Sequence, residues 1–452
     1  MAGERSPTTV GALISTSGGS IKTGPFGTVL KASEYTPDGV PLISVGEIGH
    51  GTFHIHSSTP RVPNEVTCRL PEYILQEGDI VFGRKGAVDR SARVSEAQAG
   101  WFLGSDGIRL RLPRTIDSKF MAYQLRSQES RNWIIQHATG TTMASLNQDV
   151  IARIPVLLPP LLEQRAIAHI LGTLDDKIEL NRRRNQTLEA MARALFKDWF
   201  VDFGPVRAKL EGREPYLPAD LWQLFPDRLD DEGKPEGWVV GSVEELCSSI
   251  TSGGTPARKK SIFWDGGTIP WFKTGELQDG PLLDSEEKIT ETALQESSCK
   301  LWPAGTILFA LYASPTVGRL GVLTSPATSN QAAAGLIAKE SIGVPFLRRA
   351  LLEAREKLQN IAVGAAQQNI NQTILKTHRL ALPPACMCAH YSKLVRRWDD
   401  QQVQLAYETR TLAQLRDTLL PKLISGELRI PDAEKFMERA EHRTASQTRS
   451  VS

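Results

Sequence analysis

Cysteine is scarce in this chain, which has five in 452 residues, at positions 68, 247, 299, 386 and 388. Such an odd, scattered set does not form a disulfide framework and suits a reducing cytoplasm. The start, residues 1–9, carries early charges and lacks the apolar core of a signal peptide. The longest uncharged stretch, 301–318, contains Pro303, Gly305, Pro315 and Gly318, which favour strands and turns. We therefore expect a cytoplasmic protein without a transmembrane helix.

The chain also lacks a net excess of charge of either sign. Lys and Arg number 53 against 51 Asp and Glu, which gives a net charge of +2 at pH 7. This balance does not indicate nucleic acid or membrane by bulk charge, so a site for a polyanion must be a local patch. The length of 452 residues is about three times the ~150-residue prior for one domain. Two or more domains are expected.

The signatures of several large enzyme classes are missing. None of the patterns G-x-x-x-x-G-K-[ST], G-x-G-x-x-G, H-E-x-x-H or G-x-S-x-G occurs. The tetrapeptide Asn/Asp-Pro-Pro-aromatic of amino-methyltransferases is absent too, because both Pro-Pro pairs, 159–160 and 383–384, follow Leu. The sequence therefore offers no candidate catalytic residue.

One cluster resembles a metal site. Cys386-Met-Cys388-Ala-His390, with His378 upstream, has a C-x-C spacing that differs from the usual C-x₂₋₄-C pairs of zinc sites. Packing at the start of a helix is the favoured interpretation. His50, His54 and His56 lie in a Gly-rich run and are interpreted as polar loop or strand residues rather than zinc ligands. We expect no metal in this chain.

A tandem duplication organises the chain. Residues 138–160 align with 362–384 at a constant offset of 224, and seven of the 23 aligned positions are identical. Upstream, Gly78-Asp-Ile-Val-Phe82 corresponds to Gly305-Thr-Ile-Leu-Phe309 at an offset of 227. The protein therefore contains two copies of one unit, with insertions and deletions inside each copy.

After each Pro-Pro pair the sequence predicts one long helix, over 161–203 and 385–425, each roughly 60 Å long at 1.5 Å per residue. Apolar residues recur in steps of four and three, the a/d spacing of a coiled coil. In the first helix these positions are Ile167, Leu171, Leu174, Ile178, Asn181, Asn185, Leu188, Ala192, Leu195 and Trp199. In the second helix they are Tyr391, Val395, Trp398, Gln402, Leu405, Thr409, Leu412, Arg416, Leu419 and Leu423.

Several of these seam positions are polar, including Asn181 and Asn185. A buried Asn reduces stability but specifies register and partner. Alternatively, these side chains are solvated where the helices splay apart. Under either interpretation the two helices are expected to pair with each other, as an antiparallel coiled-coil spacer.

The segments before each helix predict an α+β fold. Residues 1–160 and 238–384 mix short β-rich runs with Gly/Pro turns and short helices, over 119–136 and 344–361. Residues 204–237 are expected to be a linker, because 201–237 holds nine acidic and five basic residues with several Pro and Gly. The tail, 426–452, is predicted to be disordered.

Basic residues near glycines are the remaining candidate chemistry. Arg84, Lys85 and Arg90 surround Gly83 and Gly86 directly after a predicted strand, where backbone could approach a phosphate or a base edge. In the second copy, 251–260 combines glycines and hydroxyls with a run of cations. Either segment alone favours a hairpin with solvated charges, but their occurrence in both copies favours DNA binding. The candidate DNA-binding residues are Lys22, Arg84, Lys85, Arg90, Arg258, Lys259, Lys260, Lys273 and Arg319.

These motifs resemble a known family. The stretch Leu158-Pro-Pro-Leu-Leu-Glu-Gln164, continued by Leu174-Asp-Asp-Lys-Ile-Glu-Leu-Asn181, closely resembles the central helix of the specificity subunit of type I restriction–modification systems. The resemblance extends over residues 20–430. Further similar motifs are Thr23-Gly-Pro-Phe-Gly27, Pro235-Glu-Gly-Trp238, Ser252-Gly-Gly-Thr-Pro256 and Leu419-Leu-Pro-Lys-Leu-Ile-Ser-Gly426. The second helix start departs from the pattern, because Pro384-Ala-Cys-Met-Cys-Ala-His390 lacks the Glu-Gln pair of the first.

The resemblance implies a division of labour. Each globule would be a target recognition domain for one half of a bipartite, asymmetric double-stranded DNA target, with a gap set by the helices. Two modification subunits would dock on the helices and supply S-adenosylmethionine and adenine methylation. Motor subunits would supply ATP hydrolysis, Mg and DNA restriction, so this chain itself needs no cofactor. For base reading, Arg84 is the favoured residue, and Lys85 is favoured for phosphate contact.

Two other classes of function stay open from the sequence. The chain could be a nuclease or methyltransferase whose motif is not recognised, and methylation or cleavage by the purified chain alone would favour that interpretation. It could instead be a coiled-coil scaffold that binds only proteins. Absence of salt-dependent DNA binding by the assembled complex would favour the scaffold.

Overall fold

The computed structural model of the chain describes residues 5–140, 143–312, 315–363, 370–430 and 432–439. Its contacts divide it into two compact units, Met1–Ile178 with Thr411–Ser452, and Glu179–Arg410. The boundaries fall within the two long helices, so each unit contains one globule and a stretch of both helices. The sequence instead predicted each long helix as one undivided segment, over 161–203 and 385–425, separate from the globules.

The first globule contains three small sheets. In the largest, the strands are ordered β2-β8-β5-β6 and all neighbours are antiparallel. A second sheet has the order β4-β3-β7, with β3 and β7 parallel. The N-terminal strand β1 pairs with β9, the last strand before the first long helix. The strands are β1 (Ser6–Thr9), β2 (Ser20–Thr23), β3 (Val40–Ile43), β4 (Arg61–Val62), β5 (Ile80–Gly83), β6 (Ser91–Arg93), β7 (Phe102–Leu103), β8 (Gly107–Arg111) and β9 (Pro155–Leu158).

The α-helices in the described part of this globule are α1 (Val10–Ser17), α2 (Asn64–Arg69), α3 (Ser118–Arg126), α4 (Gln128–His137) and α5 (Gln148–Arg153). The single helix expected over 119–136 is therefore wrong, because the backbone at Ser127 is not helical (φ −59°, ψ 150°). Its side chain accepts a hydrogen bond from the amide of Ser130 and so caps α4. The central strand β5 is fully buried, with Ile80 and Phe82 packed into the main core of the globule.

The second globule repeats the sheets of the first. Its largest sheet has the order β11-β18-β15-β16, extended by β13, and a smaller one has the order β14-β12-β17. Strand β10 pairs with β19, and Leu382 takes the place that Leu158 has opposite β1, 224 residues earlier. The predicted duplication is thus confirmed. The strands are β10 (Val239–Ser242), β11 (Cys247–Ser252), β12 (Ile269–Phe272), β13 (Pro281–Leu282), β14 (Glu287–Ile289), β15 (Ile307–Ala310), β16 (Leu320–Leu323), β17 (Thr328–Ser329), β18 (Ala333–Ala338) and β19 (Arg379–Leu382).

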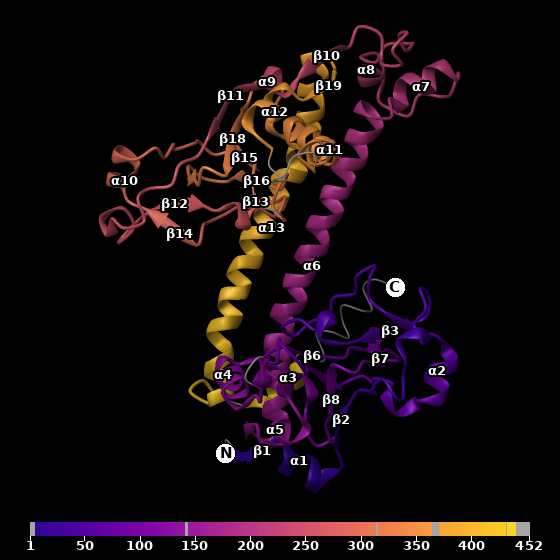
Figure 1. Ribbon diagram of the computed structural model, residues 1–452, viewed down its shortest axis with the longest axis vertical. Coiled ribbons are helices and arrows are strands. Elements are labelled where there is room, and N and C mark those ends of the chain that lie inside the picture. The colour runs from indigo at the N-terminus through magenta and orange to yellow at the C-terminus, as the bar shows by residue number, and fades with distance from the viewer. Residues whose placement is uncertain (1–4, 141–142, 313–314, 364–369, 431, 440–452) are drawn as a thin grey trace. The chain divides into compact units, whose positions relative to one another are not determined.

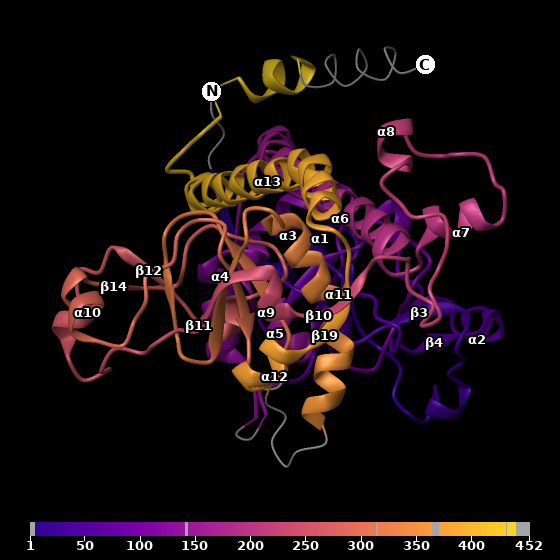
Figure 2. The ribbon, with the colours of Figure 1, turned by 90° about the horizontal axis from the view of Figure 1, so that it is seen from above.

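The helices of the second globule are α9 (Val243–Leu246), α10 (Glu291–Glu296), α11 (Val344–Val363) and α12 (Gln372–Thr377). Within this unit, both views place β12, β14 and α10 at the end of the globule away from β10 and β19 (Figure 1 and Figure 2). The smaller sheet is therefore the distal part of the globule, and α11 lies at the opposite end, near β10 and β19.

The two long helices are α6 (Leu161–Phe200) and α13 (Ala385–Ser425). In the second unit the hydroxyl of Tyr391 donates to the carbonyl of Ala192 at 2.7 Å, and the amide of Asn181 donates to Glu408 at 2.7 Å. Partners move down one helix as they move up the other, so the pairing is antiparallel, as predicted. In the first unit Arg416 of α13 contacts Asp175 of α6 at 2.7 Å.

The segment 204–237 is more ordered than the expected linker. It forms α7 (Gly204–Leu210) and α8 (Ala219–Trp222), and both views place these helices on the side of α6 away from the large sheet (Figure 1 and Figure 2). Val206 and Phe225 are buried, and the Phe225 ring lies 5.4 Å from that of Trp199. Apolar residues scattered among the charges thus pack this segment onto the end of α6.

Part of the tail, which was predicted to be disordered, is described by the structure. Residues 433–439 are helical, and the ring of Phe436 lies 5.9 Å from that of His169 on α6. Residues 431 and 440–452 lie outside the described part of the chain.

Candidate nucleic-acid interface

The hairpin between β5 and β6 holds the basic loop of the first globule. Gly86 has a φ of +73°, and a Cβ at Gly83 would lie 2.6 Å from the carbonyl oxygen of Ala87. Both positions therefore require glycine. The amide of Arg84 donates to Asp106 at 2.8 Å, and its carbonyl accepts from Leu146 at 2.8 Å. Hydrogen bonds on both sides thus hold the loop in one conformation.

Three predicted DNA-binding cations of this globule already have partners. The guanidinium of Arg84 donates to the carbonyl of Ser105 at 3.2 Å and lies 5.0 Å from the centre of the exposed Phe26 ring. The ammonium of Lys85 lies 3.5 Å from the carboxylate of Asp106. Similarly, Lys22 pairs with Glu72 at 3.8 Å and lies 4.6 Å from the centre of the Tyr73 ring.

Arg90 differs from these three residues. It immediately precedes β6 and is half-buried, and its side chain makes no hydrogen bond or ion pair within the described part of the chain. Its backbone is anchored, because its carbonyl accepts a hydrogen bond from Gly83 at 3.1 Å. The loop thus presents one uncommitted guanidinium, meaning one without a hydrogen bond or ion pair to a described residue, on a backbone that a hydrogen bond fixes in place.

Arg319 occupies the equivalent position in the second globule. Phe82 faces Ser91 across the first hairpin, as Phe309 faces Leu320 across the second, so the residues just before β6 and β16 correspond. The carbonyl of Arg319 accepts from Ala310 at 2.8 Å, repeating the anchor of Arg90. Its side chain is half-buried and also makes no hydrogen bond or ion pair with another described residue. By contrast, the position equivalent to Arg84 is the buried Leu311, whose backbone makes the same two kinds of hydrogen bond.

Arg258 lies in an aromatic cage at the distal end of the second globule. Its guanidinium carbon is 4.0 Å from the centre of the Trp264 ring and 4.7 Å from that of Trp271. The guanidinium also forms an ion pair with Glu287 on β14. Arg258 therefore has three partners, two of which are aromatic faces that a cation favours.

Of the neighbouring lysines, Lys273 shares the carboxylate of Glu287 with Arg258. Lys273 contacts Glu286 at 2.8 Å and Glu287 at 3.2 Å, whereas Lys260 lies 4.0 Å from Glu296. Hydrogen bonds from Arg258, then from Lys273, outweigh burial and hold the pKa of Glu287 below its usual range. Lys259 is exposed, without an ion pair among the described residues. A polyanion would have to displace Glu287 to engage this cluster fully.

The structure thus separates the predicted cations into two kinds. Arg90, Arg319 and Lys259 are uncommitted, and the other six are held by carboxylates, carbonyls or rings of the same globule. Sequence reasoning did not identify the partners Phe26, Trp264, Trp271 and Glu287. Phe26 could have been identified from its position inside the glycine-rich motif 23–27. For the others, only the folded sheet brings 258, 271 and 287 together.

The predicted seam positions all face away from solvent to some degree. Ile167, Leu171, Asn181, Trp199, Val395 and Leu405 are buried. Leu174, Ile178, Asn185, Leu188, Leu195, Trp398, Leu412 and Leu419 are half-buried. The side-chain carbonyl oxygens of Asn181 and Asn185 are buried without a hydrogen-bond partner in the described structure. Asn181 is thus inside the helix pair, as a register-setting residue would be.

Cys388 packs among apolar residues at the start of α13, and burial raises the pKa of its thiol to about 12. Among the described residues, no three His, Cys, Asp or Glu side chains are placed to hold a metal ion. None of the described helices has an apolar stretch long enough to cross a membrane.

Comparison with known proteins identifies the family. The family described as the type I restriction modification DNA specificity domain matches residues 26–190 and again residues 235–386, which together make up well over half of the chain. The chain belongs to this family. The two matches correspond to the two copies of the duplication; the first extends through most of α6, whereas the second ends at residue 386, at the start of α13.

Individual relatives agree with this assignment. The chain is 26% identical over 358 residues to the type I restriction enzyme HindI specificity subunit of Haemophilus influenzae. This alignment covers 69% of this chain and 77% of the relative. It is 25% identical over 334 residues to the MjaIX specificity subunit of Methanocaldococcus jannaschii, covering 73% of each chain. The crystal structure of a type I restriction–modification S subunit from M. genitalium matches with a TM-score of 0.58 and 18% identity, over 93% of this chain and 96% of that one. This likeness supports the fold.

Proposed function

We propose that this chain recognises a bipartite double-stranded DNA target for a type I restriction–modification complex, with one half-site read by each globule. The observation that carries the proposal is the duplication of an uncommitted, backbone-anchored arginine, Arg90 in one globule and Arg319 in the other. Arginine can grip guanine at two atoms in the major groove, so it suits base reading better than lysine does. The family membership supplies the class of target.

In this proposal the chemistry belongs to partner subunits. Two modification subunits carry S-adenosylmethionine and methylate adenine, and motor subunits carry ATP and Mg and restrict DNA. The long helices are the docking surface for the modification subunits. This is supported by exposed apolar side chains in their second-unit stretches, where Leu180, Met191 and Leu394 are 43%, 46% and 43% exposed.

Substitution of the two arginines in the assembled complex tests the proposal. Arg90→Ala and Arg319→Ala are assayed for methylation on the parent target and on targets mutated in one half-site at a time. Loss of a base contact should cost about 1–3 kcal/mol and relax recognition at one position of one half-site. On a target already mutated in the half-site that Arg90 reads, Arg90→Ala should therefore reduce methylation little further. On a target mutated in the other half-site, it should reduce methylation by the same factor as on the parent target.

Arg114→Ala is the matched control. Arg114 is exposed and follows β8 at the end of the strand opposite the hairpin loop, because Gly107 pairs with Gly83 whereas Leu110 pairs with Ile80. This control should leave every target unchanged. If Arg90→Ala lowers methylation of all targets alike and reduces the salt dependence by about one phosphate contact, Arg90 does not read bases. If both arginine variants affect the same half-site, the assignment of one half-site to each globule is wrong.

A further inference from the structure

Asp175 on α6 joins three elements of the first unit. Its carboxylate accepts a hydrogen bond from the Tyr123 hydroxyl at 2.7 Å and lies 3.3 Å from the guanidinium of Arg126, both on α3. Arg416 on α13 donates to its other oxygen at 2.7 Å. Burial raises the pKa of Asp175, but the hydrogen bonds from Arg416 and Tyr123 outweigh burial and hold it below the usual range. One carboxylate thus connects the recognition globule to both long helices.

Asp399 on α13 repeats this arrangement in the second unit, 224 residues later. It accepts a hydrogen bond from Arg349 of α11 at 2.7 Å and lies 3.5 Å from Arg348 of the same helix. Glu189 on α6 completes the cluster, at 2.9 Å from Arg349 and 3.1 Å from Arg348. Both arginine side chains are almost completely buried, with 1% and 6% exposed. Here a globule helix again meets both long helices, through two arginines that pair with one carboxylate on each helix.

The residues that reach these aspartates are also equivalent. Phe120 on α3 and Phe346 on α11 are both fully buried and begin the same pattern of core residues. Three residues later, the chain places Tyr123 in the first copy and Arg349 in the second. The donor therefore changed from a phenol to a guanidinium, while the accepting carboxylate stayed at the same helix position. A contact repeated with different chemistry points to a shared geometric role.

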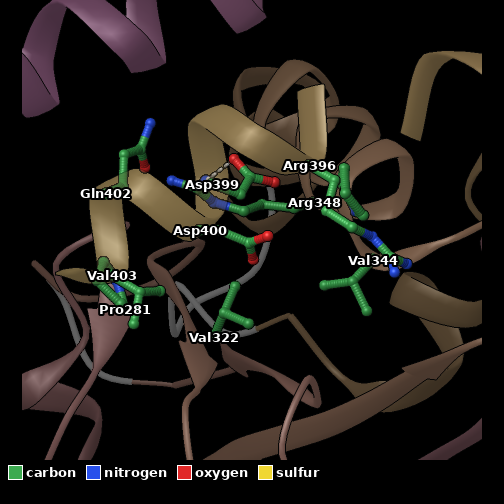
Figure 3. Close-up of a pocket in the computed structure, with 10 residues that line it drawn as sticks. Pro281, Val322, Val344, Arg348, Arg396, Asp399, Asp400, Gln402 and Val403 are labelled. Carbon is green, nitrogen blue, oxygen red and sulfur yellow. Dashed lines mark ion pairs between the residues drawn. The ribbon is translucent and has the colours of Figure 1, made fainter. Parts of the chain in front are cut away.

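Apolar packing alone does not hold α11 against α13. Figure 3 shows Asp399 facing Arg348 beside a cavity of about 170 Å³, which Val344 and Val403 also line. A cavity between two helices lets them shift relative to each other, because the side chains that line it lack packing contacts on one side. A buried guanidinium tolerates few positions, because moving it from its carboxylates leaves an unpaired charge. The ion pairs therefore restrict the position of α11, in addition to the apolar contact between Phe346 and Tyr391.

We propose that Asp175 and Asp399 are equivalent positioning residues, each of which sets the angle at which its globule is held on the long helices. The two angles together determine the length of the gap that the complex accepts between half-sites. This inference rests on the proposed function. Neither aspartate contacts DNA in this proposal; each acts through α3 or α11.

The test measures gap preference in the assembled complex. Asp175→Asn and Asp399→Asn are compared with the parent on targets whose gap is native, or one base pair shorter or longer. We expect the preference for the native gap to fall by about tenfold, the change that about 1.4 kcal/mol corresponds to. Discrimination against single-base changes within each half-site should stay at the parent level, since the reading loops are untouched. Asp→Glu variants should restore part of the gap preference.

The chain provides matched controls, because each positioning residue is followed by a second aspartate. Asp176 and Asp400 are exposed, so Asp176→Asn and Asp400→Asn should leave gap preference unchanged. Tyr123→Phe and Arg349→Lys are milder variants that keep most of the side-chain volume, and they should weaken gap preference in the same direction. If an asparagine variant fails to fold, these two variants test the inference in its place.

Two outcomes contradict the inference. If the variants lower methylation of all targets in proportion, with gap preference unchanged, the aspartates are structural only. If the control variants alter gap preference as strongly, position on the helix does not matter. A parent complex that ignores both gap and half-site sequence would instead refute the proposed function itself.

Discussion

Most of the predicted DNA-binding side chains are charged residues whose partners come from distant parts of the sequence. Arg258 pairs with Glu287 and Lys85 with Asp106, and Arg84 stacks on Phe26. Such pairs keep cations oriented in the free protein, and they compete with phosphate for the same charge. Arg90 and Arg319 have no such competitor within the described residues, so binding DNA costs them no internal ion pair.

Asp175 should make the first unit sensitive to acid. Its pKa in the folded chain is depressed, so it stabilises the fold at pH values above the unfolded pKa of about 3.9, and this contribution is lost as the pH falls through the folded pKa. Asp175→Asn should therefore be less stable than the parent at pH 7, with the difference shrinking toward pH 3. Thermal unfolding of the isolated chain across this range measures it. Asp176→Asn is the control, and a difference between parent and Asp175→Asn that stays constant with pH would contradict the prediction.

The long helices are stabilised unevenly along their length. Aromatic residues of α6 and α13 gather in the second unit, where Phe196, Phe200 and Tyr391 pack with ring centres 5.1 to 5.6 Å apart. In the first unit Ile167, Leu171 and Leu423 form a smaller cluster. Closer to the unit boundary, the second-unit stretch buries Asn181, whose carbonyl oxygen has no described partner. The apolar clusters therefore stabilise the helix pair, whereas the unpaired oxygen of Asn181 reduces its stability.

Truncation at the seam tests this distribution. Leu171 is fully buried, whereas Leu162 on the same helix is 43% exposed. Leu171→Ala should destabilise the first unit by about 2–5 kcal/mol, because it removes buried methyl groups and leaves a cavity. Leu162→Ala should change stability by less than about 0.5 kcal/mol. Urea unfolding of the isolated chain compares them, and equal effects would show that the helix does not pack along the predicted face.

On the scale of the whole molecule, the duplication combines a repeated framework with divergent loops. The strand orders β2-β8-β5-β6 and β11-β18-β15-β16 are the same, yet Arg84 is replaced by Leu311 at the equivalent loop position. The framework residues are buried and constrained by packing, whereas loop residues are free to vary. Two globules of one fold can therefore read different half-sites.

The isolated chain should have no methyltransferase activity. The purified protein is incubated with target DNA and labelled S-adenosylmethionine, first alone and then with modification subunits. Methyl transfer is expected only after the subunits are added, because the sequence has no methyltransferase tetrapeptide. Methylation by the chain alone would place catalysis here. Failure of the complete mixture to methylate a matching target would refute the assigned role.

The sequence by itself determined the duplication and the two long helices. The duplication follows from the constant offset of 224, and the helices follow from the a/d spacing and the Pro-Pro boundaries, which are visible in consecutive residues. The a/d spacing does not specify direction, so the contacts of Tyr391 and Asn181 decided that the expected antiparallel pairing is correct. Sequence also indicated the basic hairpin, because Gly83 and Gly86 mark a turn that only glycine allows. The break between α3 and α4 was missed, because Ser127 fits a helix interior as well as a cap and only its backbone angles decide.

Only the tertiary structure decided which charged residues form ion pairs within the chain. Arg349 and Asp399 are 50 residues apart, and Asp175 and Arg416 are 241 apart, so no local pattern could pair them. The charges of segment 204–237 predict a linker, but Val206 and Phe225 pack onto an apolar surface at the end of α6. Burial and ion pairing are properties of surfaces that meet after folding, and composition does not specify which surfaces meet.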